Sequence, residues 1–444
     1  MRWIGLAIIF LSIPMLIAWI GRDMRRRDLA VLAAGALMFC TGPLQITASL
    51  VAWPAWQGIS KGIILSLLDS IAIALLATRP RQSNRAPFLP LIALFTLPIL
   101  LSVTQAGVKE AAFFIVFQML QMTVYFIALA GELRRPAAVS SLMKGLSIGL
   151  MIEAGYVISQ KLSGVVQAPG TTAHQNILGI MVELSALPLI AAVLEGKQSK
   201  LVYAGLFAAL IVIAGGGSRG TMLYFSVGVA IVLGLSLARH ATPRKWQIFG
   251  LGVLALAITA PLAYATLKDR FGNTEITTEE DQRAAFERAA RAMAADHPLG
   301  VGANNFVTVD NLQGYADRAG LTWGSATRSK PAHNAYLVAR AETGWAGEIG
   351  LILLMGALAF AGIKIGFRMR KAQHLGYALG GAGAIIAVAF HSNYEYAWYL
   401  ADTQRLFFTN AALIAGCMAM AKQGKARPGN PKRPGHHHAL ARRP

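Results

Sequence analysis

Charged residues are scarce in this sequence, making up 14% of its 444 residues. A soluble globular domain carries about 25%, so this chain lacks the polar surface that it would need in water. Cysteine is nearly absent as well, and Cys40 and Cys417 each lie inside an apolar run. We therefore expect neither a disulfide framework nor a cysteine-based metal site.

Long apolar segments take up most of the chain, 55% of which is hydrophobic. They predict an all-α polytopic membrane protein of about 12–13 transmembrane helices, because roughly 17–25 apolar residues cross a bilayer as a helix. The expected spans are Trp3–Ile20, Leu29–Trp53, Ile59–Ala77, Phe88–Val103, Ala111–Ala130, Val139–Ile158, Asn176–Leu194, Leu201–Ala214, Thr221–Ala238, Ile248–Leu267, Ala335–Ile363, Leu375–Phe390 and Leu406–Met420.

The net charge of +20 would suggest nucleic-acid binding in a soluble protein. Here the lysines and arginines fall in alternate loops between the apolar segments, which is typical of cytoplasmic loops in membrane proteins. We therefore expect a cytoplasmic C-terminus and no nucleic-acid partner. The basic clusters are Arg22–Arg27, Arg79–Arg85, Arg134–Arg135, Lys197–Lys200, Arg239–Lys245 and Lys364–Lys371.

One long polar interval, Lys268–Ala332, interrupts the apolar segments. The alternation of basic loops predicts that it lies outside the cytoplasm, and a loop of this length usually carries function. The predicted regions are an N-terminal transmembrane bundle (1–267), this loop (268–332), C-terminal transmembrane helices (333–421) and a basic cytoplasmic tail (422–444).

The long loop should contain an amphipathic helix. Thr277–Thr278 before acidic residues is typical of a helix start, and Pro298 is typical of a stop. Arg283 lies beside the apolar stripe of this helix, whereas Arg288 is more solvated. The apolar residues at helical spacing are Phe286, Ala289 and Met293.

A glycine-rich turn, Gly215–Gly217, leads to Arg219 between two short apolar segments. Dense glycine allows a sharp turn and a close approach of a ligand to the backbone. An arginine near membrane level is costly unless it meets an anion or water. Arg219 is therefore either a phosphate-binding residue or an interfacial side chain that reaches lipid headgroups.

His333 begins the apolar segment after the long loop, with Asn334, Tyr336 and Glu342 close behind it. Imidazole is the side chain best matched to accept a proton near neutral pH. A structural or interfacial histidine is the alternative. The place of His333 at the expected extracytoplasmic face favours a catalytic role.

Aromatic residues gather in the last expected extracytoplasmic segment, Ser392–Tyr399. Tyrosine and tryptophan are enriched at membrane interfaces, so an aromatic belt is one interpretation. The other is a sugar site, in which Tyr394 stacks on the apolar face of a ring and Glu395 holds hydroxyl groups.

Catalytic triads, Walker loops, CxxC pairs and metal-spaced histidines are missing from the expected exposed loops. Arginines without a carboxylate cluster suggest an anion that guanidinium groups hold directly. We therefore expect no metal and no cofactor.

In order and spacing, these motifs resemble the O-antigen ligase and Wzy-type polymerase superfamily over Gly215–Gly350. The motifs are Ser218-Arg219-Gly220, Arg283 with the downstream Asp296–Gly302, and His333-Asn334 with Glu342–Gly344. The resemblance implies a GT-C-like bundle in the bacterial inner membrane that transfers a glycan from undecaprenyl diphosphate at the periplasmic face. The predicted activity is that of a ligase, whose acceptor is a sugar hydroxyl of lipid A–core.

The same resemblance implies roles for single residues. Arg219 and Arg283 should bind the diphosphate and stabilise its growing negative charge, and His333 should be the general base of an inverting, metal-independent transfer. Membrane lipids are the remaining expected partners. The other expected substrate contacts are Asn334, Arg288, Glu342, Tyr336, Tyr394 and Glu395.

Other functions remain open at this point. A repeat-unit polymerase or a protein O-oligosaccharyltransferase would share the donor site and differ in its acceptor. A lipid-linked glycan transporter is the alternative from another class, although transporters usually show internal repeats and sites near the bilayer midplane. A non-catalytic scaffold would leave Arg219, Arg283 and His333 individually dispensable.

Overall fold

The protein folds as a bundle of helices, which confirms the predicted fold class. The computed structural model describes residues 2–40, 46–79, 86–250, 275–368 and 372–425. The helices are α1 (Arg2–Ile20), α2 (Met24–Leu37), α3 (Leu67–Ala77), α4 (Leu89–Ser102), α5 (Lys109–Glu132), α6 (Pro136–Leu162), α7 (Gln175–Glu195), α8 (Lys200–Gly216), α9 (Arg219–Arg239), α11 (Glu275–Asp296), α12 (Phe306–Leu312), α13 (Tyr315–Arg318), α14 (Ser325–Arg328), α15 (Ala335–Arg368), α16 (Gln373–His391), η2 (Ala397–Tyr399) and α17 (Ala401–Lys425).

Seven helices in the described part are long and apolar enough to cross a membrane. They are α1, α5, α6, α7, α9, α15 and the segment His374–His391 within α16. Three shorter apolar helices, α3, α4 and α8, lie among them. The expected span Ile248–Leu267 falls almost wholly outside the described residues.

Two of the expected spans, Leu29–Trp53 and Ile59–Ala77, are wrong. Between α2 and α3 the chain forms two antiparallel strands, β1 (Thr47–Ala52) and β2 (Gly62–Ser66), with Thr47 opposite Ser66. Mean hydropathy cannot separate an apolar strand from an apolar helix. Pro54 lies two residues after the end of β1, where it would break a helix but suits a turn.

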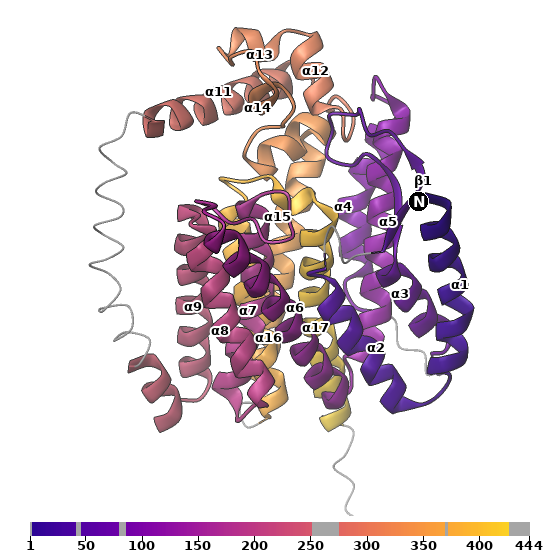
Figure 1. Ribbon diagram of the computed structural model, residues 1–444, viewed down its shortest axis with the longest axis vertical. Coiled ribbons are helices and arrows are strands. Elements are labelled where there is room, and N and C mark those ends of the chain that lie inside the picture. Colours follow the sequence, from indigo (N-terminus) through magenta and orange to yellow (C-terminus); the bar gives the residue numbers. More distant parts are fainter. Residues whose placement is uncertain (1, 41–45, 80–85, 251–274, 369–371, 426–444) are drawn as a thin grey trace, which may run out of the picture.

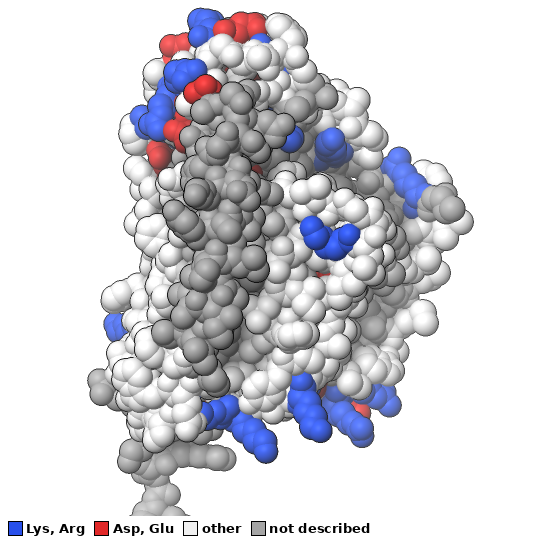
Figure 2. Space-filling model, turned by 60° about the vertical axis from the view of Figure 1, so that its left-hand side comes forward, with Lys and Arg blue, Asp and Glu red and all other residues white. Residues whose placement is uncertain are grey.

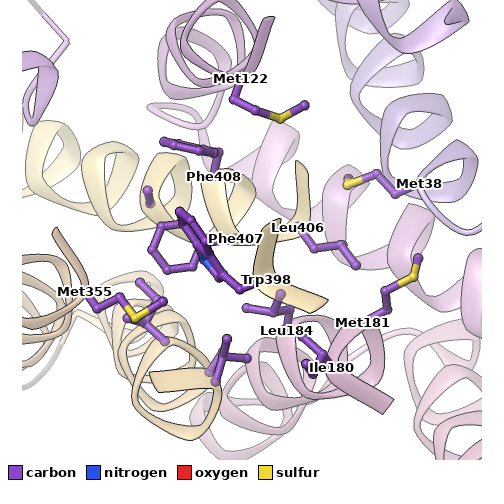
Figure 3. Close-up of a cluster of buried hydrophobic side chains, with 14 of the residues drawn as sticks. Met38, Met122, Ile180, Met181, Leu184, Met355, Trp398, Leu406, Phe407 and Phe408 are labelled. Carbon is purple, nitrogen blue, oxygen red and sulfur yellow. The ribbon is translucent and has the colours of Figure 1, made fainter. Parts of the chain in front are cut away.

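Small residues let the helices of the bundle approach closely. A Cβ atom on Gly145 of α6 would lie 2.2 Å from the Leu32 carbonyl oxygen of α2, so only glycine fits this crossing. Further inside, Figure 3 shows Trp398 of η2 and Phe407 of α17 among Leu184 of α7 and Met355 of α15. This cluster joins the C-terminal helices to the rest of the bundle.

The bundle has two dissimilar ends (Figure 1). We call the end that carries β1, β2 and α11–α14 the loop end, and the opposite end the basic end. Figure 2 shows lysine and arginine side chains along the basic end. There Arg27, which is 1% exposed, donates to Glu132 and to the Thr78 carbonyl (3.0 Å). Arg239 pairs likewise with Glu195.

The segment between α11 and α12 attaches the loop end to α15. The Val301 and Gly302 N–H groups donate to the carbonyls of Ala341 and Glu342, both at 2.9 Å. Gly302 has φ +95°, in the left-handed region that glycine adopts without strain. The glycine motif found in the sequence therefore serves to dock the loop on the first turns of α15.

Asn304 connects the same segment to the hairpin. Its Nδ2 donates to the carbonyls of Ser60 (2.7 Å) and Ala111 (2.8 Å), and its Oδ1 accepts from the Ser60 N–H (3.1 Å). One buried side chain thus satisfies backbone groups of the β1–β2 turn and of α5. The hairpin, α5 and the long loop meet at this residue.

Candidate active site

Three segments that are distant in the sequence meet around His333. His333 Nδ1 lies 3.0 Å from Oε1 of Glu395, which is 4% exposed. The other oxygen of Glu395, Oε2, accepts from Asn176 Nδ2 in the first turn of α7 at 2.7 Å. The result is a half-buried histidine held by a buried carboxylate, which in turn accepts a hydrogen bond from a half-buried amide.

The start of α15 fixes the position of His333. Asn334 Oδ1 accepts from the N–H groups of Tyr336 and Leu337, both at 3.1 Å, and so caps the helix. The Ala335 N–H donates to the Ser392 carbonyl at 2.8 Å. Asn334, expected to contact substrate, therefore holds the helix start beside the segment that supplies Glu395.

Aromatic rings flank the imidazole on two sides. Phe286 of α11 and Tyr396 each meet His333 edge to face, with ring centroids 5.6 and 5.5 Å apart. Because Nδ1 faces Glu395, we assign the proton of a neutral imidazole to Nδ1. Nε2 is then the nitrogen that can accept a proton.

Glu395 is ionised at neutral pH. Burial alone would raise its pKa, but the hydrogen bond and positive charge of His333, with the hydrogen bond from Asn176, lower that pKa to about 2. A carboxylate in this position stabilises the imidazolium that forms when the histidine takes a proton, as in catalytic triads. The geometry leaves Nε2 able to accept a proton.

Lys330 and Arg283 add positive charge near this pair. His174, next to Asn176, has its pKa lowered first by burial, while Glu395 opposes the shift. The positive charges that add to the lowering are those of Lys330, His333 and Arg283. Arg283 therefore lies close enough to His174 to affect the pKa of that histidine, as His333 does. His174, Asn176 and Lys330 belong to no motif, and the sequence analysis missed them.

Arg219 begins α9, at the loop end of the bundle (Figure 1). Gly217 has φ +61°, so the chain turns sharply there, and Ser218 Oγ accepts from the Thr221 N–H at 3.3 Å. The Gln167 side chain donates to the Gly217 carbonyl at 3.4 Å. This links the Arg219 turn to the segment that leads to His174.

Three further candidates from the sequence are engaged within the protein. Glu342 Oε1 accepts from the Phe306 N–H at 3.1 Å, which holds the long loop. The Tyr336 hydroxyl donates to the Ala389 carbonyl at 2.7 Å. Arg288 Nη2 donates to the Ala319 carbonyl at 3.0 Å, between α11 and α13.

Tyr394, the remaining candidate, is 56% exposed. Its ring centroid lies 5.9 Å from that of Tyr224 on α9. An exposed aromatic side chain beside α9 suits contact with sugar or lipid.

Residues 204–352 match the family model described as O-antigen ligase. This part of the chain is similar to that family. The resemblance read from the motifs is thereby confirmed, with nearly the same bounds. The matched segment extends from α8 to α15 and contains Arg219, Arg283 and His333. Asn176 and Glu395, which complete the histidine site, lie outside it. No curated protein matches the chain.

Proposed function

We propose that the protein is an O-antigen ligase, which transfers a glycan from undecaprenyl diphosphate to a sugar hydroxyl of lipid A–core. The observation that carries the proposal is the His333–Glu395 pair, with cationic side chains near it, within or beside the segment that matches the O-antigen ligase family. A base beside an anion site is the combination that glycosyl transfer from a diphosphate requires.

In the proposed reaction, His333 Nε2 takes the proton of the acceptor hydroxyl as its oxygen attacks the anomeric carbon. The bond between that carbon and the diphosphate oxygen breaks on the opposite face, so the configuration inverts. Glu395 stabilises the imidazolium that results. The proton later leaves His333 for solvent.

The leaving diphosphate gains negative charge as the bond breaks. Arg283 and Arg219 are proposed to bind it, because guanidinium groups form paired hydrogen bonds with phosphate oxygens. Lys330 adds positive charge to the same region. In this scheme guanidinium groups supply the charge that a metal ion supplies in other transferases.

We place the protein in the bacterial inner membrane, with the loop end facing the periplasm. The basic end, with its arginine-rich turns, then faces the cytoplasm, as the distribution of lysine and arginine in membrane proteins requires. The tail after α17 would be cytoplasmic. Both substrates would be amphiphiles that reach the site from the outer leaflet.

A deletion strain tests the activity. The lipopolysaccharide is separated on a gel, and undecaprenyl-linked glycan is measured in parallel. Core without attached O-chain, together with accumulated lipid-linked polymer, would establish a ligase. Core that carries a single repeat would identify a polymerase instead, and an unchanged pattern would refute lipopolysaccharide as the product. Complementation with His333→Ala separates catalysis from a scaffold role, because a scaffold would restore the wild-type pattern.

A further inference from the structure

A second histidine–glutamate pair lies inside the bundle, and the proposed reaction does not use it. His391, the last residue of α16, has its Nδ1 2.8 Å from Oε1 of Glu183 on α7. His391 is 2% exposed and Glu183 is fully buried. The pair is therefore more enclosed than His333–Glu395.

The imidazole of His391 packs against the first two turns of α9. The ring of Tyr224 stacks on it, with centroids 4.8 Å apart and an angle of 28° between planes. A Cβ atom on Gly220 would lie 3.2 Å from His391 Nε2. Gly220 and Tyr224 are four residues apart and share one face of α9. Arg219 directly precedes Gly220 in the sequence. His391 therefore packs against the helix turn that carries this arginine.

A contribution to stability does not by itself explain why the protein has a buried His391–Glu183 pair. Desolvation of two ionisable groups in a membrane interior costs several kcal/mol, and apolar side chains of similar size often do as well or better. In addition, Glu183 Oε2 is buried with no hydrogen-bond partner among the described residues. A role in the site offers a reason to keep the pair.

The two histidine–glutamate pairs are built on the same elements. Asn176, which holds Glu395, lies two turns before Glu183 on α7, and Glu395 follows His391 by four residues. The positive charge of His391 also lowers the pKa of Glu395. α7 and the end of α16 thus set the position of both pairs together.

We propose that His391 is a positioning residue for the donor site. Held by Glu183, it fixes the first turn of α9 and with it the place of the Arg219 guanidinium relative to the His333–Glu395 pair. The proposal rests on the proposed function, because it takes Arg219 as a ligand of the donor's diphosphate.

The test uses a double variant, His391→Phe with Glu183→Leu, in the full-length protein reconstituted in lipid nanodiscs. Phenylalanine keeps a ring against Tyr224, and leucine removes the carboxylate that would otherwise be buried without a partner. Three quantities are measured: the melting temperature, KM and kcat with the lipid-linked donor, and the Kd for undecaprenyl diphosphate.

We expect the double variant to melt near the wild-type temperature. Its donor KM and its Kd for undecaprenyl diphosphate should each rise about tenfold, because a displacement of a binding group by a fraction of an ångström weakens positioning. The kcat at saturating donor should fall less. A purely structural residue would change the melting temperature and leave these constants unchanged in the folded fraction.

His374→Phe is the matched control, because it makes the same replacement at the other end of α16. Its donor KM should equal that of the wild type. Gly220→Ala provides a second measurement that does not depend on the buried pair. Its added methyl group would lie 3.2 Å from His391 Nε2, and it should raise the donor KM about threefold through a smaller displacement.

A folded double variant with wild-type donor KM and lipid affinity would overturn the proposal. Should the double variant fail to fold, an unchanged donor KM in Gly220→Ala would overturn it equally. Arg219→Ala, measured in parallel, tests the underlying assumption. If Arg219→Ala keeps full affinity for undecaprenyl diphosphate, the assignment of Arg219 in the proposed function fails, whatever the His391 variants show.

Discussion

The basic end and the loop end of the bundle both bury carboxylates beside cationic side chains, but they balance the charges differently. At the basic end, Glu195 meets both Arg239 and Lys245, and Arg239 also donates to the Gly366 carbonyl at 2.6 Å. Each group there faces a partner from the protein itself. Such clusters hold turns together.

Around His174 at the loop end, cationic groups outnumber carboxylates. Glu395 is the one negative charge that shifts the pKa of His174, against three groups of the opposite sign. An excess of positive charge at a membrane surface suits an anionic ligand. If the loop end binds an anion as proposed, the balance of charge separates this binding site from the structural cluster at the basic end. The number of ion pairs does not separate them as well.

The largest expected effect is that of His333→Ala, which removes the proposed base. We expect kcat to fall about 10²–10⁴-fold, the usual contribution of a general base, with the protein still folded in the membrane. His374→Ala, a histidine variant at the basic end, should keep wild-type activity. Transfer assays on both purified variants check this. Full activity in His333→Ala would assign the site another role.

Arg283 and Arg288 form a matched pair on α11. Arg283→Ala should lower kcat/KM about 10²–10³-fold, as the loss of a group that stabilises developing charge does. Arg288→Ala removes only a hydrogen bond to the Ala319 carbonyl and should change it about twofold or less. Steady-state kinetics with the lipid-linked donor measure both. Equal losses would contradict the assignment of the anion site to Arg283.

At the basic end, Arg27→Met should lower the stability of the protein and leave its transfer activity unchanged. It leaves the buried Glu132 with Arg135 as its remaining cation, so we expect a loss of about 3 kcal/mol in the free energy of unfolding. Activity per folded molecule should stay at the wild-type level. The double variant Arg27→Met with Glu132→Leu should recover most of the stability. A stable but inactive Arg27→Met variant would contradict the assignment of stability to the basic end and of activity to the loop end.

The smallest effect concerns pH. The pKa of Glu395 is about 2 in the folded protein and near 4.5 in its ordinary environment. Its contribution to stability is therefore fully present above pH 4.5 and is lost as pH falls from 4.5 toward 2. Melting temperatures of the wild type and Glu395→Gln should differ at pH 7, approach each other as pH falls below 4.5 and converge near pH 2. A difference as large at pH 2 as at pH 7 would show that the carboxylate charge is not responsible.

Much of the fold follows from local patterns in the sequence. The amphipathic helix ends at Asp296, two residues before the stop expected at Pro298, and its stripe residues Phe286, Ala289 and Met293 are buried. The motifs also led to Arg283 and His333, which both affect the pKa of His174 in the structure. Helical periodicity and turn residues act over a few residues, so a single sequence contains them.

Other features depend on contacts between distant segments and escaped the sequence analysis. The pairing of β1 with β2 looks like two apolar spans when only hydropathy is considered. Glu395 looked like a sugar ligand in an aromatic segment, because nothing near it in the sequence shows that it meets His333 and Asn176. Glu342 looked like a substrate contact until the fold placed a backbone N–H of the long loop against it.

The hydrogen bonds of the Asn304 side chain have a consequence for the order in which the protein folds during synthesis. Ser60 and Asn304 are 244 residues apart, so the hairpin is synthesised and inserted long before its partner leaves the ribosome. During that interval we expect the β1–β2 hairpin to lack its hydrogen bonds to Asn304. The loop end should therefore reach its final structure last. In membranes, Asn304→Ala should leave the β1–β2 turn open to added protease, whereas the wild type resists. The order of synthesis would then keep the loop end open until Asn304 is in place.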